Sequence, residues 1–289
     1  MSVPLLFATL GALISERAGV LAVFMDGAIT LSGFIAIAVT MATGNPLSGF
    51  ITSAILTTGL LMVLAWFTEH TRANPFLVGL SVNFLASGTT SWLSSHLFGT
   101  RGVIALADSG IHWRIPGILS VTAALFFTII VWWTLTHTLF GLRLSASGPA
   151  PQILTVRGSN PARYRIASWG IAGFFAVCAG TILAFNLGAY VPNLSAGRGW
   201  TALAALYLAY RKPLPCIAAV LVFSGAEYIT TILQGTTLVP ASIILGLPYA
   251  LALLVFLFIP QTESAKKPHK FSTILIAVSF FPKILCYHV

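Results

Sequence analysis

The sequence contains very few charged residues. Of its 289 residues, 57% are hydrophobic and only 7% are charged, with six acids against fifteen lysines and arginines. Soluble domains carry about 25% charged residues, so this chain cannot cover a surface that faces water. Its mean hydropathy of +0.93 agrees with this interpretation. We therefore expect an integral membrane protein.

Other absences exclude several classes of chemistry. Six carboxylates leave little scope for acid–base pairs or hard-metal sites, and Cys178, Cys216 and Cys286 stand far apart in apolar runs without metal-ligand spacing. The chain has no P-loop, G-x-S-x-G or H-E-x-x-H motif. The sequence offers no set of catalytic residues that would support an intramembrane enzyme. We therefore do not expect an enzyme.

Apolar runs recur along the whole chain. A helix needs about 20 apolar residues to cross the hydrocarbon core. Because the apolar residues are continuous rather than alternating, they favour helices over a β-barrel. We predict an all-α, polytopic transmembrane helical bundle of about 8–10 membrane segments. The long runs are 20–42, 50–67, 76–98, 117–136, 167–187, 214–233 and 241–259, and the short ones are 1–14 and 200–210. The last of these is either a short crossing or a re-entrant or broken helix.

Basic residues indicate the orientation of these segments. If every run crosses, one side holds Arg17, Arg72, Arg143, Arg157, Arg163, Arg165, Arg211, Lys212, Lys266, Lys267 and Lys270. The other side holds Arg101, Arg114 and Arg198, and Lys283 lies in a tail of unassigned placement. Basic loops face the cytoplasm in membrane proteins. The first group is therefore predicted to be cytoplasmic.

Two regions lie outside the predicted spans. We divide the chain into a transmembrane domain, 1–260, and a cytoplasmic linker with a divergent C-terminal tail, 261–289. The longest cytoplasmic connection, 137–165, contains four arginines and three prolines. A loop of this length is a candidate docking site for a cytoplasmic partner. The alternative is a linker that its charge alone holds inside.

Polar residues within the spans are the candidate site. Asp26 and Glu227 fall inside predicted spans, where a charge costs about 2.5–3.5 kcal/mol even on lenient scales. Asn83 lies in mid-span, and Asn186 flanks the outer end of its span. We expect these four to line a substrate pathway, although helix-packing hydrogen bonds remain an alternative. The tryptophans near span ends are expected to be interfacial anchors: Trp66, Trp92, Trp132, Trp133, Trp169 and Trp200.

Four stretches, in order, resemble a known family. Residues 11–36 contain S-E-R-A-G-V followed by D-G, and residues 73–93 contain G-L-S-V-N-F-L-A-S-G-T-T-S. Residues 141–165 begin G-L-R-L and end A-R-Y-R, and residues 194–227 contain A-G-R-G-W-T-A-L-A-A. Together they resemble the ABC-importer permeases of the branched-chain amino acid, simple sugar and nucleoside class. The chain is most similar to the short permease partner of nucleoside-type importers.

The resemblance implies a set of partners and a location. This chain would bind no cofactor, and ATP would bind to separate cytoplasmic ATPase subunits. Other partners would be a second, longer permease in a heterodimer, an extracytoplasmic substrate-binding protein and membrane lipid, with no nucleic acid. Residues of the 137–165 loop, namely Arg143, Gly148, Arg157 and Gly158, would couple the ATPase to the helices. The protein would be multi-pass in the bacterial inner membrane.

The resemblance also implies a substrate class. We expect the permease to translocate a small polar molecule with a ring, a nucleoside first of all. Riboflavin and simple sugars are alternatives that the sequence does not separate. A more distant alternative is a secondary transporter that works without ATP. Such a transporter would be expected to show an inverted repeat of helices, and we find no convincing repeat.

Overall fold

The computed structural model describes residues 2–109 and 115–234, all within the compact unit Met1–Phe256. In this part of the chain, six helices are long and apolar enough to cross a membrane. They are α2 (Met25–Thr43), α3 (Pro46–Thr71), α4 (Pro75–Phe98), α5 (Gly117–His137), α8 (Pro161–Leu187) and α10 (Pro213–Gln234). The prediction of an all-α, polytopic bundle is confirmed. The predicted span 241–259 and the tail 261–289 lie outside the described residues.

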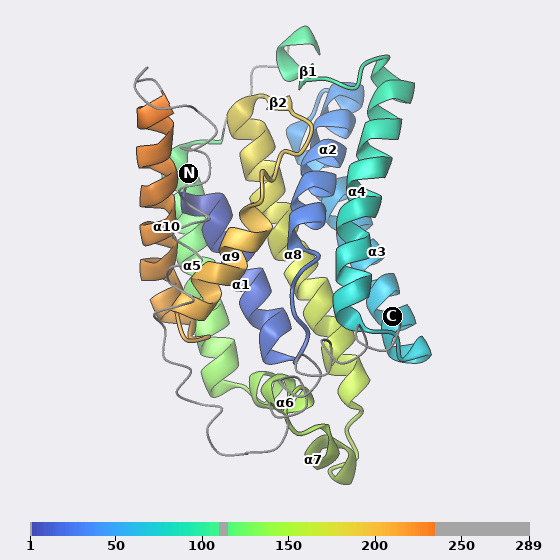
Figure 1. The fold of residues 1–289 in the computed structure, drawn as a ribbon, viewed down its shortest axis with the longest axis vertical. Helices are drawn as coiled ribbons and strands as arrows, with labels where there is room; N and C mark the ends of the chain where they lie inside the picture. Colours follow the sequence, from blue (N-terminus) through green and yellow to red (C-terminus); the bar gives the residue numbers. More distant parts are fainter. Residues whose placement is uncertain (1, 110–114, 235–289) are drawn as a thin grey trace, which may run out of the picture. The chain divides into compact units, whose positions relative to one another are not determined.

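Shorter elements complete the fold. Helices α1 (Ser2–Arg17) and α9 (Arg198–Leu208) lie inside the bundle, whereas α6 (Leu139–Ser147) and α7 (Pro151–Val156) form the connection between α5 and α8. The strands β1 (Ile104–Ala105) and β2 (Ala189–Tyr190) pair antiparallel, and the 3-10 helix η1 (Leu106–Ser109) follows β1. Figure 1 shows this strand pair at one end of the bundle and α6 and α7 at the other.

Three long helices begin with the same local signal. An asparagine precedes a proline at the start of α3, α4 and α8, and its side chain accepts a hydrogen bond from the amide two residues later, at 2.9–3.0 Å. Asparagine satisfies a free amide of the first turn, and proline tolerates the first helical position because it has no amide to leave unpaired. Helices α2, α4 and α8 end at glycines with left-handed backbone, Gly44, Gly99 and Gly188, which is a favoured helix ending.

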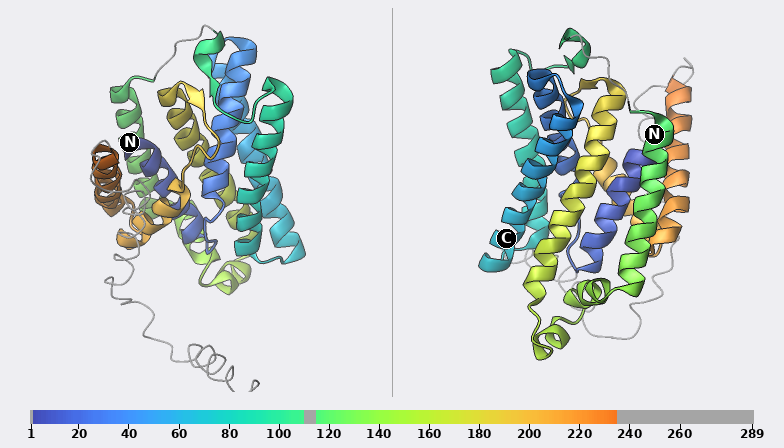
Figure 2. Two further views of the ribbon diagram at one scale, coloured as in Figure 1. Left: turned by 45° about the horizontal axis from the view of Figure 1, so that its top comes forward. Right: turned by 180° about the vertical axis from the view of Figure 1, so that it is seen from behind.

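Helix α8 is the centre of the packing. It contacts α1, α2 and α3, and both views in Figure 2 show it between these elements. Small residues allow the close approach: a Cβ on Gly173 would lie 2.8 Å from Leu61 Cδ1, and one on Gly180 would overlap Ser32 Oγ. Such small-residue contacts let helices pack closely where lipid supplies little hydrophobic driving force. In contrast, α3, α4 and α5 each bury only 22% of their apolar span, as lipid-facing helices do.

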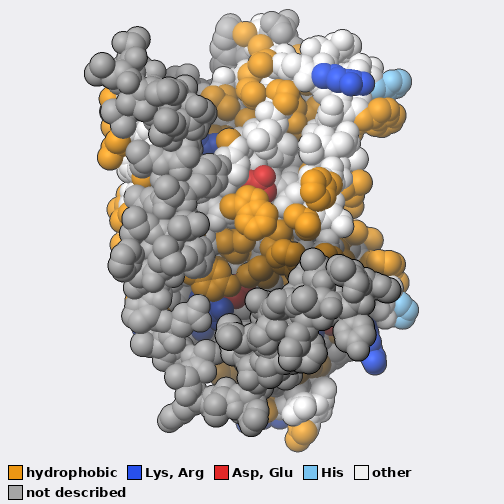
Figure 3. Space-filling model, in the orientation of Figure 1, with side chains coloured by type: hydrophobic (Ala, Val, Ile, Leu, Met, Phe, Trp, Pro, Cys, Tyr) orange, Lys and Arg blue, Asp and Glu red, His pale blue; other side chains and the backbone are white. Residues whose placement is uncertain are grey.

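The two ends of the bundle agree with the predicted orientation. The C-terminal residue of α1, Arg17, donates two hydrogen bonds to the carbonyl of Arg211 after α9. At the same end, Arg165 at the start of α8 contacts Glu69 at the end of α3. These residues all come from segments that the basic-residue distribution assigns to the cytoplasm. On the right-hand edge of Figure 3, basic and histidine side chains lie near both ends, with hydrophobic side chains between them.

The predicted start of one span was wrong, and the structure selects between the two alternatives for another. The predicted span 20–42 begins as a helix only at Met25, because residues 18–24 form an irregular segment. Helix α9 has 11 residues and is about 16 Å long, which is too short for a hydrocarbon core of about 30 Å. It therefore matches the broken-helix alternative for 200–210.

Candidate functional site

The segment between α1 and α2 is irregular and mostly buried. Ala18, Val20, Ala22, Val23 and Phe24 are each at most 2% exposed. Irregular backbone at membrane depth is tolerated only where protein or a water-filled cavity surrounds it. Here Asn83 and Ser147, from other elements, donate hydrogen bonds to two of its carbonyl groups, and the Phe24 ring stacks on that of Trp169 with centroids 4.4 Å apart.

Trp169 is therefore a core residue. Its side chain is 2% exposed, and the expectation that it anchors the protein at the membrane interface was wrong. The reason is that α8 starts eight residues earlier, at Pro161, and turns this position toward the α1–α2 segment. Trp66, Trp92, Trp133 and Trp200 expose 43–64% of their surface, as interfacial anchors do.

Asn83 connects α4 to the start of α2. Its Nδ2 donates to the carbonyl of Val23 at 2.9 Å, and its Oδ1 accepts from the amide of Gly27 at 2.8 Å. Asn83 lies eight residues beyond the first residue of α4, about 12 Å along that helix. The N-terminus of α2 is therefore held at the depth of the middle of α4. A Cβ on Gly27 would lie 2.7 Å from Asn83 Cα, so only glycine permits this approach.

Asp26 makes the corresponding contact with α9. It lies in the first turn of α2, and its Oδ1 accepts a hydrogen bond from the amide of Gly199 at 3.1 Å. Gly197 is the N-cap residue of α9 and has no side chain that could cap the helix. Asp26 therefore caps α9 from a different part of the chain. Capping contributes about 0.5–2 kcal/mol, and a carboxylate also interacts favourably with the positive end of a helix.

An ion pair extends the cluster to α10. Arg198, the first residue of α9, lies with its Nη2 3.6 Å from Glu227 Oε2, and each side chain is 16% exposed. Charges at such depth are costly unless they are paired. Three of the four residues predicted to line a pathway, Asp26, Asn83 and Glu227, are therefore brought together around the N-termini of α2 and α9.

The fourth predicted residue lies elsewhere. Asn186 is exposed in the last turn of α8, next to β2, and no contact that the structure describes joins it to the other three. Arg198, by contrast, was predicted only as an outer-side topology residue. A signal was present in the glycines on both sides of it, Gly197 and Gly199, because glycine allows close approach of another backbone.

The cluster can bind polar groups but shows no catalytic arrangement. Two helix N-termini meet there, and they are accompanied by two carboxylates, one guanidinium and one amide. Discontinuous helices whose ends meet near the bilayer midplane form substrate sites in membrane transporters. In Figure 3, acidic atoms reach the surface among hydrophobic side chains on one face. Within residues 2–109 and 115–234, no group of three or more His, Cys, Asp or Glu could hold a metal ion.

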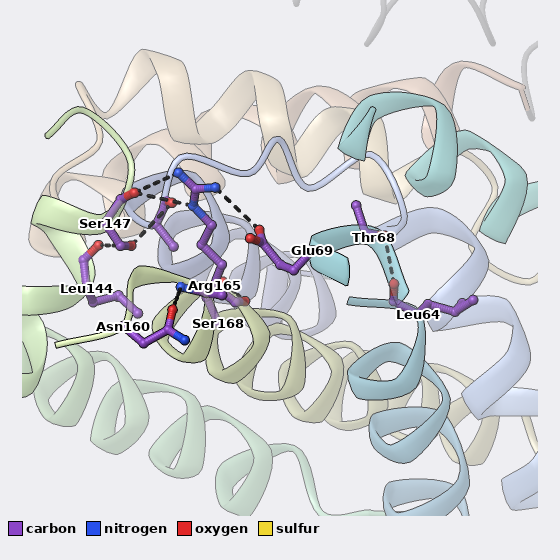
Figure 4. A network of polar contacts seen from close by, with 10 residues as sticks. Leu64, Thr68, Glu69, Leu144, Ser147, Asn160, Arg165 and Ser168 are labelled. Carbon is purple, nitrogen blue, oxygen red and sulfur yellow. Dashed lines mark hydrogen bonds and ion pairs between the residues drawn. The ribbon is translucent and has the colours of Figure 1, made fainter. Parts of the chain in front are cut away.

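The cytoplasmic loop is attached to the bundle by Arg165 (Figure 4). This side chain donates to the carbonyl of Ser147 from Nε at 3.2 Å and from Nη2 at 2.9 Å, and its Nη1 lies 3.4 Å from Glu69 Oε1. Ser147 Oγ in turn lies 3.4 Å from the carbonyl of Ala18. The end of α6 is thereby joined to α3, α8 and the α1–α2 segment.

A backbone contact strengthens this attachment. Gly148 lies directly against Gly19, and a Cβ on Gly148 would be 2.7 Å from Gly19 Cα. Gly19 has a φ of +83°, a conformation that favours glycine. Gly148, predicted for the coupling loop, therefore contacts the same segment that leads to Asp26.

The other three predicted coupling residues have different surroundings. Arg157 is exposed just after α7, beside Val156 and near Ile153, which are 88% and 54% exposed. Arg143 donates from Nη1 to Tyr164 Oη at 3.2 Å. Arg143 and Gly158 both line an open pocket of about 410 Å³ between α6 and the start of α8.

A further set of polar contacts at the cytoplasmic end of the bundle was not predicted. Glu16 Oε1 lies 2.9 Å from Arg211 Nη2 and accepts a hydrogen bond from Tyr207 Oη at 2.9 Å. Together with the two bonds from Arg17 to the Arg211 carbonyl, these contacts join the end of α1 to the end of α9. The S-E-R stretch therefore has a structural role at this end of the bundle.

Comparisons with known proteins agree with this arrangement. Residues 1–260 match the model of the family described as branched-chain amino acid transport system / permease component. The nucleoside ABC transporter permease protein NupC of Lactococcus lactis is 25% identical over 92% of both chains. The guanosine ABC transporter permease protein NupQ of Bacillus subtilis is 26% identical over 91% of both.

A third relative has a different name. The putative glucose ABC transporter permease protein TsgC13 of Haloferax volcanii is 29% identical over 72% of this chain and 68% of its own. No solved structure matches this chain. The family match covers nearly the whole length, and the six long apolar helices agree with it. The chain belongs to the branched-chain amino acid transport system permease family, as a multi-pass, inner-membrane permease subunit of an ABC importer.

Proposed function

We propose that this chain is one permease of a heterodimeric importer that moves nucleosides into the cell. A second, longer permease would complete the membrane part, ATP would bind only to the partner ATPase subunits, and an extracytoplasmic protein would deliver the substrate. The names of two relatives, which specify a nucleoside and guanosine, support the substrate class. The observation that carries the proposal is the meeting of the α2 and α9 N-termini beside Asp26.

The hydrogen-bonding groups of the polar cluster suit a nucleoside. A nucleoside is uncharged and carries ribose hydroxyls and base edges that both donate and accept hydrogen bonds. Asp26 and Glu227 accept, Arg198 donates, and Asn83 does both. We place Asp26, Asn83 and Glu227 on the translocation pathway, with the exposed Asn186 near its outer entrance.

Substitution of Asp26 tests the pathway. Asp26→Asn keeps an oxygen to accept from the Gly199 amide, since asparagine and aspartate are comparable caps, but it removes the charge. We expect uptake to fall about tenfold or more while the amount of assembled complex is unchanged. Asn83→Ala should also lower uptake, whereas Asn45→Ala, which removes a local cap of α3, should not. Normal uptake by the Asp26→Asn complex would remove this residue from the pathway.

The cytoplasmic loop is the proposed contact with the ATPase. Helix α7 offers the exposed apolar side chains of Ile153 and Val156 next to Arg157, a combination found at protein interfaces. In this proposal Gly148 holds the loop against the α1–α2 segment, and Arg143 and Gly158 shape its other end. Movement of α7 would then reach the polar cluster through Gly19 and the segment that follows it.

Capture of the ATPase in detergent tests this contact. Arg157→Glu reverses the charge beside the apolar face of α7 and should weaken capture about tenfold. Arg72→Glu is the matched control, because Arg72 is also an exposed arginine, at the end of α3. Equal capture by the two variants would assign Arg157 to membrane topology alone.

The substrate alternatives can be separated outside the membrane. The relative named as a putative glucose permease favours a simple sugar as the second candidate, and riboflavin is the third. A thermal-shift measurement on the cognate binding protein against guanosine, inosine, glucose, pentoses and riboflavin compares them directly. Stabilisation by a nucleoside supports the proposal, whereas stabilisation only by glucose, a pentose or riboflavin contradicts the nucleoside assignment.

A further inference from the structure

Two arginines line the pocket between α6 and the start of α8 without a carboxylate beside them. Arg143 comes from α6 and Arg163 from the first turn of α8, and the remaining lining is Phe140, Gly158, Ser159, Asn160, Tyr164 and Ala167. In the part of the chain that the structure describes, neither arginine forms an ion pair. The volume of about 410 Å³ is within the range of small-molecule sites, about 300–1,000 Å³.

The polar residues that line this pocket come from α6 and from the start of α8. Arg143 Nη1 is fixed by its hydrogen bond to Tyr164 Oη at 3.2 Å, and the Phe140 and Tyr164 rings lie 6.0 Å apart at one wall. Asn160 precedes the 27-residue helix α8 and caps its first turn by accepting a hydrogen bond from the amide of Ala162. Two arginines near the positive end of the α8 dipole favour an anion, above all one with several oxygen acceptors such as a phosphodiester.

The depth of α6 places the pocket at the membrane surface. Gly141 of α6 packs so closely on α5 that a Cβ there would lie 2.6 Å from Leu135 Cα. Leu135 lies in the last turn of α5, which ends at His137. Helix α6 therefore lies beside the last turn of a membrane helix. The side chains that α6 turns outward, Leu139 and Leu142, are apolar and 70% and 61% exposed. Such an amphipathic helix lies in the bilayer interface.

We propose that this pocket binds the headgroup of an anionic phospholipid of the cytoplasmic leaflet. The phosphodiester lies between Arg143 and Arg163, and the acyl chains lie along Leu139 and Leu142. Basic pockets on the cytoplasmic side of membrane helices bind anionic headgroups in this way. The lipid would support the connection between α6 and α8, from which α7 projects. This inference does not depend on the identity of the transported substrate.

Lipid retention by the purified, delipidated complex tests the proposal. Native mass spectrometry after addition of phosphatidylglycerol or phosphatidylcholine measures the relative affinity of each lipid. We expect phosphatidylglycerol to be preferred, and Arg143→Gln or Arg163→Gln each to weaken its binding about fivefold, from the contribution of one basic residue near a membrane surface. Arg143→Lys should retain most of the binding, and Arg72→Gln should bind as the wild type does.

Three results would overturn the proposal. Unchanged phosphatidylglycerol binding by the Arg143→Gln and Arg163→Gln complexes would show that the lipid binds elsewhere. Displacement of the lipid by an equal concentration of inorganic phosphate would assign the pocket to a soluble anion. Loss of ATPase capture in Arg143→Gln, with phosphatidylglycerol binding intact, would assign the pocket to the protein interface.

Discussion

Replacing Gly19 with alanine tests the contact between the cytoplasmic loop and the α1–α2 segment. The added methyl group would overlap Gly148 Cα, and the backbone at Gly19 has a φ of +83°. The left-handed conformation costs a residue with a Cβ about 1–2 kcal/mol, and overpacking costs about 1–3 kcal/mol more. We expect Gly19→Ala to lower the free energy of unfolding by about 2–5 kcal/mol in total.

Two other glycines separate the conformational cost from the contact. Gly44 has a φ of +72° with nothing within 4 Å of its Cβ position, so Gly44→Ala should cost only about 1–2 kcal/mol. Gly148 has a φ of −81° but faces Gly19, so Gly148→Ala should show the contact cost alone, about 1–3 kcal/mol.

Thermal unfolding of the purified complex, followed by tryptophan fluorescence, ranks the three variants. The account predicts that Gly19→Ala unfolds at the lowest temperature and also loses transport per ATP hydrolysed, because the segment that carries loop motion toward Asp26 is displaced. If Gly19→Ala and Gly44→Ala unfold at the same temperature and transport equally well, the loop does not rest on this segment.

Two further predictions concern the ion pairs. Arg198→Gln and Glu227→Gln should each destabilise the protein by about 1–3 kcal/mol, because each removes one partner of an ion pair whose side chains are only 16% exposed, and the double variant should be less destabilised than the sum of the two. Strict additivity in chemical unfolding would show that the two charges do not interact. Arg165→Gln should release the end of α6 and raise the rate of proteolysis within residues 137–165 severalfold, measured by mass spectrometry of the fragments. An unchanged cleavage rate would mean that the contacts of Arg165 with Ser147 and Glu69 do not hold the end of α6 in place.

The long helices were predictable because their signals are local. Continuous apolar runs fix the existence of a spanning helix, and α4 and α5 were predicted within one residue of their observed ends, 76–98 and 117–136 against Pro75–Phe98 and Gly117–His137. The start of α2 was not predictable in this way. Residues 18–24 are as apolar as a helix, and what keeps them irregular is their contact with Asn83, Ser147 and Trp169, which are distant in the sequence.

The candidate site was predictable only in part, for a similar reason. Asp26, Asn83 and Glu227 were identified because polar side chains are costly in a membrane, and this criterion applies to each residue alone. It does not say that the three meet, nor that Arg198 joins them. The positive charge of Arg198 also led to an incomplete interpretation, because a base next to a span was taken as a topology signal. In the structure, Glu227 compensates this charge within the bundle.

Transport in a defined system tests the central claim most directly. The chain, its partner permease and the ATPase subunits are reconstituted in proteoliposomes, the binding protein is added outside, and uptake of labelled guanosine is measured with and without ATP inside. The account predicts uptake only when ATP and the ATPase are both present, and little uptake with Asp26→Asn. Guanosine uptake by vesicles that contain this chain without any ATPase or ATP would contradict the account.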